Sequence, residues 1–172
     1  MFGLFLENGP LRVSRTGGGA DDFELKAAQN SWADTYNMIF LDQPVGTGFS
    51  YGDSFLTSMQ DGSDEFLTFL NEFYNIYPEL KENKFYLTGE SYAGKYLPLF
   101  THDILESNKN ATFKIPLVST MIIDPYPSPV LQRTDMHEVP FALGIIDQNN
   151  LNQIASLEQI CYHDYTYNIS KG

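Results

Sequence analysis

The strongest constraint on the fold of this chain is a serine set between a short β-prone run and a helical run. Residues 85–88 (FYLT) lead directly into residues 89–94 (GESYAG). Small residues two places before and two places after a serine predict a sharp strand-to-helix turn, because such a turn brings backbone close to backbone. The turn would hold the Ser91 hydroxyl above the sheet, as a nucleophile requires. The strict pattern has glycine where Ala93 stands, so an ordinary serine in a surface loop is the alternative.

The runs around this turn alternate between strand and helix patterns. Residues 37–41 and 117–123 are apolar runs that predict buried strands, the second long enough to be buried on both faces. Two helices are predicted, one over 61–77 and one over 92–106 with Pro98 near its first turn. Strand, helix, strand, helix, strand implies right-handed crossovers and a mostly parallel sheet covered by helices. The predicted fold class is α/β, of the α/β-hydrolase type.

Four stretches together resemble the serine carboxypeptidases, α/β hydrolases that remove single C-terminal residues from peptides. They are residues 3–10, 30–32, 37–51 and 85–98, including FLDQPVGTGFSY at 40–51. The resemblance implies that Ser91 is the nucleophile and that the backbone amide of Tyr92 is one donor of the oxyanion hole. It also implies acyl-enzyme hydrolysis at acidic pH. No cofactor and no metal site are predicted.

Three further residues match substrate-binding positions of that family. Glu7 and Glu90 resemble two glutamates that share a proton and hydrogen-bond the C-terminal carboxylate of the substrate. Two carboxylates in contact cannot both ionise cheaply, so such a pair keeps a proton that it can donate. Leu6 and Tyr92 resemble positions that line the subsites beside the scissile bond. The alternatives are exposed surface acids for the glutamates and core packing for Leu6 and Tyr92.

The resemblance also implies that the domain is incomplete. The family's oxyanion loop would precede Gly3, and its catalytic aspartate and histidine would follow Gly172. Residues 1–125 are predicted to form the core segment with the serine turn, and 126–172 a helical segment leading into a cap, with helices over 136–144 and 148–160. In this segment Leu151, Ile154, Leu157 and Ile160 form an apolar stripe that should pack on a partner surface. The turn at 122–125 lacks the family's Ile-Gly-Asn-Gly pattern.

The three histidines of the chain are predicted to be solvated surface residues. His102 lies three turns beyond Ser91 on the predicted helix, and His137 and His163 lie in polar stretches. A general base must reach hydrogen-bonding distance of the serine hydroxyl, and none of the three has a route there. We therefore expect the isolated chain to be inactive or nearly so. A non-catalytic peptide-binding remnant, a partial gene product and an acyltransferase are the alternative functions.

Composition limits the partners. A formal net charge of −12 disfavours nucleic acids and anionic membranes. No stretch reaches about 18 apolar residues, so no membrane span is predicted, and residues 1–6 do not form a signal peptide. The family instead implies peptide C-termini as partners, and a secretory, lysosomal or vacuolar, or extracellular location.

Two sequons and one cysteine complete the candidate sites. Asn110 and Asn168 each begin an Asn-X-Ser/Thr sequence and are predicted glycosylation sites. Cys161 is the single cysteine, and with His163 and Asp164 it offers too few ligands for zinc, so an idle thiol is expected. The triple glycine at 17–19 has acidic neighbours and no following Lys-Ser/Thr, which predicts a surface loop rather than a phosphate site.

Overall fold

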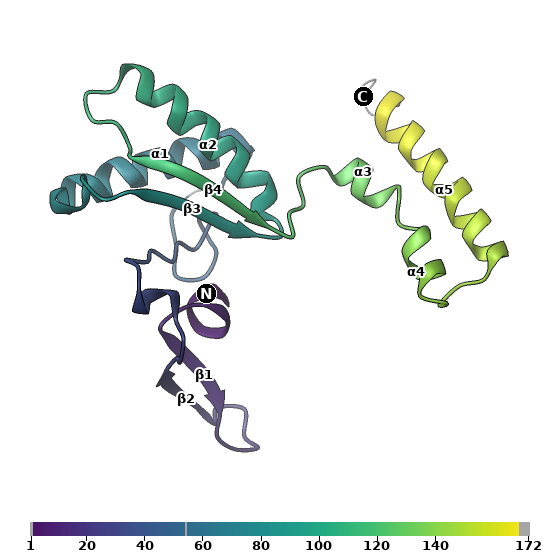
Figure 1. Cartoon of the computed structure of the whole chain (residues 1–172), viewed down its shortest axis with the longest axis horizontal. Helices are drawn as coiled ribbons and strands as arrows, with labels where there is room; N and C mark the ends of the chain where they lie inside the picture. Colours follow the sequence, from purple (N-terminus) through teal and green to yellow (C-terminus); the bar gives the residue numbers. More distant parts are fainter. Residues whose placement is uncertain (1, 54, 169–172) are drawn as a thin grey trace. The chain divides into compact units, whose positions relative to one another are not determined.

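The computed structural model describes residues 2–53 and 55–168 of the chain (Figure 1). These residues fall into two units, Met1–Gly62 and Ser63–Gly172. The division between 1–125 and 126–172 that the sequence suggests stays a prediction.

The first unit is built around a hairpin. After the short helix η1 (Gly3–Glu7), strand β1 (Leu11–Arg15) pairs antiparallel with β2 (Phe23–Ala27). The glycines at 17–19 lie in the exposed loop between them, where the Gly19 amide donates to Asp22 Oδ2 at 2.8 Å. The predicted surface loop is confirmed, and it is a hairpin connection.

A second short helix, η2 (Trp32–Asp34), is hydrogen-bonded to Asn8 through its N-cap residue, Ser31. Ser31 Oγ accepts from the Ala33 amide at 3.0 Å and donates to the Asn8 carbonyl at 3.0 Å. The Trp32 amide also donates to the Asn8 carbonyl, at 3.0 Å. An N-cap serine of this kind stabilises a helix start by satisfying an amide that lacks a partner within the helix.

The strand predicted over residues 37–41 is wrong. These residues form no strand within the described chain, and the side chains of Ile39 and Leu41 are 43% and 37% exposed. The described sheets pair only β1 with β2 and β3 with β4. An apolar run becomes a strand only where another strand satisfies its backbone groups, and sequence pattern alone does not supply that partner.

The family-like block that follows folds as a loop organised by Asp42. Its Oδ2 accepts from the Phe49 amide at 2.8 Å, and its carbonyl accepts from Ser50 Oγ at 2.7 Å. Gly48 has φ +54, and a Cβ there would collide with the Asp42 carboxylate. Glycine at 48 is therefore required twice, by its backbone conformation and by the space beside it.

The second unit places a parallel strand pair under two helices. Its first elements are α1 (Met59–Ile76), whose first four residues belong to the first unit, η3 (Pro78–Leu80), β3 (Phe85–Glu90), α2 (Ala93–Asn110) and β4 (Leu117–Ile123). Strands β3 and β4 pair parallel, with a register irregularity between Phe85 and Tyr86. The two predicted helices and the strands predicted over 85–88 and 117–123 are confirmed. Pro98 is the sixth residue of α2 rather than a first-turn residue.

The hydrophobic core lies between these helices and the strand pair. Its buried residues come from α1, β3, α2 and the segment before β4: Phe66, Leu70, Tyr74, Leu87, Leu97, Phe100, Ile104 and Ile115. The rings of Phe66 and Phe100 stack at 4.4 Å between centroids and join α1 to α2. A hydrogen bond from Ser63 Oγ to Asp103 Oδ2 at 2.6 Å also joins α1 to α2. The hydroxyls of Thr101 and Thr120 are hydrogen-bonded at 2.7 Å and join α2 to β4.

The expectation that β4 is buried on both faces is wrong. Val118, Met121 and Ile123 are 54%, 46% and 44% exposed. Helices α1 and α2 lie on one side of the strand pair (Figure 1), so the side chains that point the other way are uncovered in the described structure. An apolar run predicts where a strand can be buried, but the covering layer decides whether it is.

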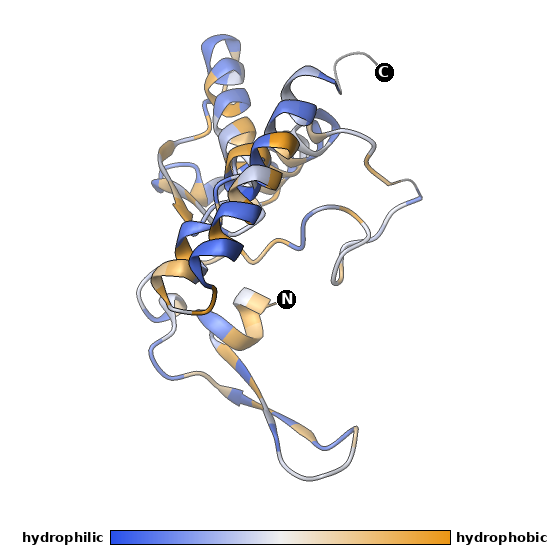
Figure 2. Ribbon diagram, turned by 90° about the vertical axis from the view of Figure 1, so that its right-hand side faces the viewer, coloured by the Kyte–Doolittle hydropathy of each residue, from blue (hydrophilic) through white to orange (hydrophobic). Residues whose placement is uncertain are grey.

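Three helices follow the sheet: α3 (Pro129–Arg133), α4 (Glu138–Ala142) and α5 (Gln148–Tyr167). The predicted helices over 136–144 and 148–160 are confirmed as α4 and α5. Polar stretches interrupted by apolar residues run along α5 (Figure 2). Of the predicted stripe, Leu157 and Ile160 are 64% and 58% exposed, so this part of it has no cover. No helix in the described part of the chain is long and apolar enough to cross a membrane.

Candidate functional site

Ser91 occupies the turn between β3 and α2, as predicted. Strand β3 ends at Glu90, α2 begins at Ala93, and Ser91 has φ 56 with an exposed side chain. Positive φ is uncommon for a residue with a Cβ and concentrates at sites where the surrounding structure enforces it. The serine hydroxyl is therefore presented by a strained and firmly held backbone.

The hydrogen bonds around Ser91 show what enforces this backbone. Its amide donates to the Ile123 carbonyl at the end of β4, at 3.0 Å. Its own carbonyl accepts from the Gly94 amide at 3.0 Å and from the Tyr126 amide at 2.8 Å. The serine is thus tied to α2, to β4 and to the loop after β4.

The small residues of the motif are explained by the packing. A Cβ at Gly89 would lie 2.5 Å from the Cβ of Ala93, and a Cβ at Gly94 would lie 2.6 Å from the Tyr126 nitrogen and 2.7 Å from Pro125 Cβ. Both glycines are required because α2 packs closely on β3 and on the loop after β4. The methyl group of Ala93, which departs from the strict pattern, fits because Gly89 across from it has no side chain.

The second departure from the family pattern is accommodated at Asp124. This residue follows β4 and has φ 41, in the left-handed region. Aspartate tolerates that region better than most residues with a side chain. The turn at 124–126 therefore still delivers the Tyr126 amide to Ser91 without the family's glycine pattern.

Tyr92 combines an unpaired amide with an exposed ring. Within the described residues, the Tyr92 amide donates to no backbone oxygen, as expected at a helix start. The ring is 49% exposed and lies edge-on to Tyr96, with 5.1 Å between centroids. An amide without a partner directly after the serine is available to an incoming oxyanion.

The two glutamates and Leu6 are placed in different units. Glu90 is exposed at the end of β3, next to Ser91. Glu7 ends η1, is exposed, and its carbonyl accepts from Arg12 Nη2 at 2.7 Å. Leu6 lies in the same helix and is 50% exposed. The predicted pairing of Glu7 with Glu90 and the subsite role of Leu6 stay predictions.

None of the histidines is bonded to Ser91. His102 and His163 are exposed, as predicted; His102 pairs with Asp103 at 2.8 Å and His163 lies 3.7 Å from Asp164. The prediction that His137 is a solvated surface residue is wrong, because its side chain is only 23% exposed.

The partner of His137 is a buried acid that no sequence pattern indicated. His137 Nδ1 lies 2.6 Å from Glu158 Oε2, and Glu158 Oε1 accepts from the Met136 amide at 2.9 Å. Burial would raise the pKa of Glu158, but the hydrogen bonds from the Met136 amide and His137 outweigh it and lower the pKa. Glu158 thus joins α5 to the segment before α4 as a carboxylate.

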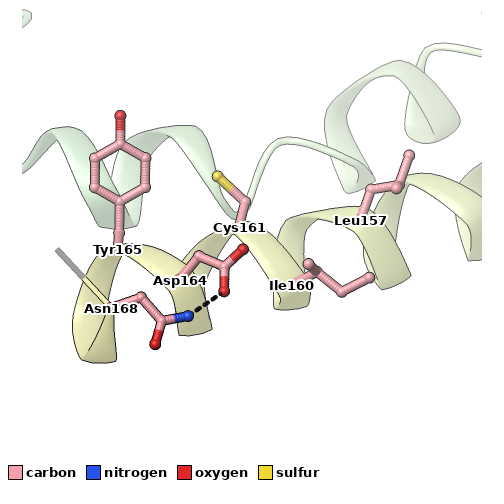
Figure 3. A pocket seen from close by; sticks show the side chains of 6 residues that line it. All are labelled: Leu157, Ile160, Cys161, Asp164, Tyr165 and Asn168. Carbon is pink, nitrogen blue, oxygen red and sulfur yellow. Dashed lines mark hydrogen bonds between the residues drawn. The ribbon is translucent and has the colours of Figure 1, made fainter.

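The remaining predicted sites lie on helices α2 and α5. Asn110 is the exposed last residue of α2, and Asn168 is exposed at the end of α5, its side-chain amide donating to Asp164 Oδ1 at 2.7 Å. Asn168 also belongs to an open hollow on α5 together with Leu157, Ile160, Cys161, Asp164 and Tyr165 (Figure 3). Cys161 is a free thiol. No group of metal-ligating side chains occurs among residues 2–53 and 55–168.

Comparison with known proteins gives a consistent set of relatives. The sequence model of the serine carboxypeptidase family matches residues 1–171. The chain is 37% identical over 161 residues to the pheromone-processing carboxypeptidase KEX1 of Ogataea parapolymorpha, covering 92% of this chain and 25% of that protein. It is also 37% identical over 162 residues to the venom serine carboxypeptidase of Apis mellifera, covering 92% and 33%.

A solved structure agrees with these sequence relatives. The prohormone-processing carboxypeptidase Kex1 of Saccharomyces cerevisiae superposes with a TM-score of 0.83 at 28% identity, covering 96% of this chain and 36% of that one. The α/β-hydrolase type of fold is thereby confirmed. The chain spans about a quarter to a third of the length of the sequence relatives it matches.

Proposed function

Because the chain belongs to the serine carboxypeptidase family, we propose that it carries the nucleophile and part of the substrate cleft of an enzyme that releases C-terminal residues from peptides. One observation carries this proposal: Ser91 has φ 56 and an exposed side chain at the junction of β3 and α2. A strained backbone that lifts a hydroxyl out of the sheet is the arrangement that nucleophilic catalysis by serine uses.

In the proposed reaction, Ser91 Oγ attacks the carbonyl carbon of the last peptide bond while a general base takes the hydroxyl proton. The Tyr92 amide donates to the oxyanion, the C-terminal residue leaves as an amine, and water hydrolyses the acyl-enzyme. The family resemblance implies that the base is a histidine held by an aspartate, and we assign neither role to His102, His137 or His163.

Substrate recognition is proposed to rest on Glu7, Glu90 and Leu6. If the two carboxylates meet in the assembled cleft, one proton shared between them can be donated to the C-terminal carboxylate of the substrate. Binding would then weaken as pH rises and the shared proton is lost. Leu6 and the Tyr92 ring would form apolar walls beside the scissile bond.

The proposal includes a secretory, lysosomal or vacuolar, or extracellular setting with glycans at Asn110 and Asn168. Both asparagines are exposed at helix ends, which is compatible with modification. Treatment of the protein from a secreting cell with an amidase that removes N-glycans tests this directly. A shift in mass that disappears in Asn110→Gln and Asn168→Gln is the expected result.

A chimera tests the catalytic proposal. Residues 3–168 would replace the matching segment of Kex1 from Saccharomyces cerevisiae, which supplies the rest of the fold. We expect the chimera to be labelled by a fluorophosphonate probe and to release C-terminal residues, with both activities lost in Ser91→Ala. A folded chimera that is labelled at another residue, or is not labelled, would contradict the assignment of Ser91.

The 172-residue chain by itself favours a second behaviour, binding without turnover. The observation behind it is that each histidine, His102, His137 and His163, lies beside a carboxylate and is not bonded to Ser91. A serine without a base is a weak nucleophile at neutral pH. We expect slow, non-saturable probe labelling of the isolated chain. Rapid labelling that vanishes in Ser91→Ala would show that the chain holds a complete catalytic set.

A further inference from the structure

Next to the serine turn, two cations contact the ring of Tyr126. Lys95 Nζ lies 5.7 Å from the ring centroid and Arg133 Cζ lies 5.6 Å from it. Arg133 Nε also donates to Tyr126 Oη at 2.6 Å, and Lys95 Nζ lies 5.9 Å from the centroid of the Tyr92 ring. Distances within about 6 Å are those of cation–π contacts, which orient a charged side chain without neutralising it.

This cluster, Lys95, Tyr126 and Arg133, is attached directly to the nucleophile. The Tyr126 amide donates to the Ser91 carbonyl at 2.8 Å, and Lys95 stands in the first turn of α2, where its amide donates to the Tyr92 carbonyl at 3.0 Å. The positions of both cations are therefore determined by the same backbone that positions the serine. A ligand held by them would therefore be bound by residues next to the serine turn.

Within the described chain, no neighbouring carboxylate neutralises the charge of this cluster. The chain has 22 acidic and 10 basic residues. Even so, neither Lys95 nor Arg133 has a carboxylate within 4.0 Å among the described residues, although Glu90 ends β3 and Asp124 directly follows β4. In a strongly acidic protein, an acidic ligand is repelled everywhere except where local cations attract it.

Most hydrogen-bond donors of the two cations are also unused. Among the described residues Arg133 donates only through Nε, and Lys95 Nζ donates to none of them. The guanidinium can therefore offer its Nη atoms as a fork, the geometry that binds a carboxylate through two parallel bonds. Lys95 can add a third donor from the ammonium group.

We infer that Lys95 and Arg133, oriented by Tyr126, form a carboxylate-binding subsite that selects peptides with an acidic side chain near the scissile bond. The inference rests on the proposed function, which makes a peptide the substrate. The C-terminal carboxylate is already assigned there to Glu7 and Glu90. The two cations are thus left for a second carboxylate, and the side chain of Asp or Glu is the one that peptides supply.

Four short peptides separate the two sources of carboxylate. Acetyl-Ala-Glu-Ala and acetyl-Ala-Gln-Ala, each as the free acid and as the C-terminal amide, would be titrated into the 172-residue chain by calorimetry at low salt. We expect the Glu peptides to bind about fivefold more tightly than the Gln peptides, in both terminal forms, as for a partly exposed ion pair. Equal affinities, or no binding of any peptide, would overturn the subsite.

Charge variants identify the residues responsible. Lys95→Met and Arg133→Met should each remove most of the preference for Glu over Gln, and Lys95→Arg should retain it. Lys109→Met is the matched control, since Lys109 lies in the last turn of α2 and pairs with Glu106. A preference that survives both Met variants would overturn the assignment. If the Met variants instead lose only the difference in affinity between the free-acid peptides and the C-terminal amides, the cations bind the C-terminal carboxylate. That result would also overturn the assignment.

A measurement without mutation keeps the inference testable if a variant fails to fold. Salt screens an exposed ion pair, so the preference of the unmodified chain for Glu should fall as ionic strength rises from about 0.01 M to about 0.5 M, because the Debye length shortens from about 30 Å to about 4 Å. A preference independent of salt would overturn the subsite. Because these experiments measure binding, they can succeed while the chimera fails to be labelled at Ser91, and the reverse.

Discussion

The described part of Met1–Gly62 holds several of the most family-like motifs and no buried apolar side chain, whereas every residue of the hydrophobic core lies between Phe66 and Ile115. Glu7 and the loop around Asp42 belong to the first unit, and Ser91 belongs to the second. The first unit is organised by turns, caps and one hairpin. The second is organised by apolar packing of two helices on a strand pair. Several of the most family-like motifs therefore lie outside the part of the chain that contains the hydrophobic core.

The difference has a consequence for function. The serine turn is enforced by contacts from its own unit, since α2, β4 and the loop after β4 all bond to Ser91. Glu7, which is proposed to bind the substrate, lies on a helix with no buried residue. We expect Ser91, the proposed nucleophile, to keep its conformation under changes that disturb the first unit.

The largest effect should come from the core. Ile104→Ala removes a side chain that is fully buried among the core residues, and we expect a loss of about 3 kcal/mol in the free energy of unfolding. Leu25→Ala in β2 is the matched control, because Leu25 is 57% exposed and should cost less than about 1 kcal/mol. Urea denaturation monitored by circular dichroism measures both. Equal losses would remove the contrast between the two units.

The next effect concerns close backbone packing. Gly94→Val places side-chain atoms where the Tyr126 nitrogen and Pro125 Cβ already lie, and we expect it to cost about 2 kcal/mol. Gly18→Val in the hairpin loop meets nothing within 4 Å and should be nearly neutral. Denaturation midpoints of the two variants check this. If Gly94→Val leaves the denaturation midpoint unchanged, the loop after β4 does not pack closely enough on α2 to restrict the serine turn.

A smaller effect, of opposite sign, is expected at Ser91, the proposed nucleophile. Ser91→Gly relieves the positive φ and should stabilise the chain by about 1 kcal/mol, since glycine adopts that conformation without strain. Ser91→Ala keeps the Cβ and should bring no such gain. Both variants remove the hydroxyl. If the two variants have the same stability, the backbone at Ser91 is not strained.

The smallest effect extends the comparison to the helices after β4, where Glu158 is the buried residue of α5. Its pKa is lowered in the folded chain, so its carboxylate contributes stability above its ordinary pKa, and that stability is lost as pH falls through the folded pKa. Glu158→Gln should cost about 0.5 kcal/mol at neutral pH and nothing in acid.

Thermal unfolding is measured from about pH 3 to about pH 7 in steps of about half a pH unit. It tests whether the stabilities of Glu158→Gln and the unmodified chain become equal as pH falls. Glu138→Gln, at an exposed position of α4, is the control and should leave the pH profile unchanged. Parallel profiles for the Glu158 variant and the unmodified chain would show that Glu158 is not a charged link between α5 and the segment before α4.

Sequence reasoning performed best where local patterns are self-sufficient. The spacing of Phe66, Phe69, Leu70 and Phe73 predicted α1, and GESYAG predicted the turn that the structure contains. It missed the hairpin, although Leu11 and Val13 alternate with Arg12 and Ser14 ahead of the glycine loop, which is a usable signal for a strand.

It failed where the outcome depends on a partner. Residues 37–41 have the composition of a buried strand and no pairing strand within the described chain. His137 has polar neighbours in sequence, yet Glu158, 21 residues further on, partly buries it. No local pattern indicates a contact between residues so far apart in the chain.

The order of residues by itself determined the position of the serine turn, the two helices beside it, and the family. Those features follow from small residues and apolar spacings within a few positions of one another, where backbone sterics act directly. Only the tertiary structure decided that Asp124 and Tyr126 hold Ser91, that Lys95 and Arg133 meet at one ring, and that β4 keeps an exposed face. These depend on contacts between distant segments, and the free energy of such contacts is set by packing geometry rather than by composition.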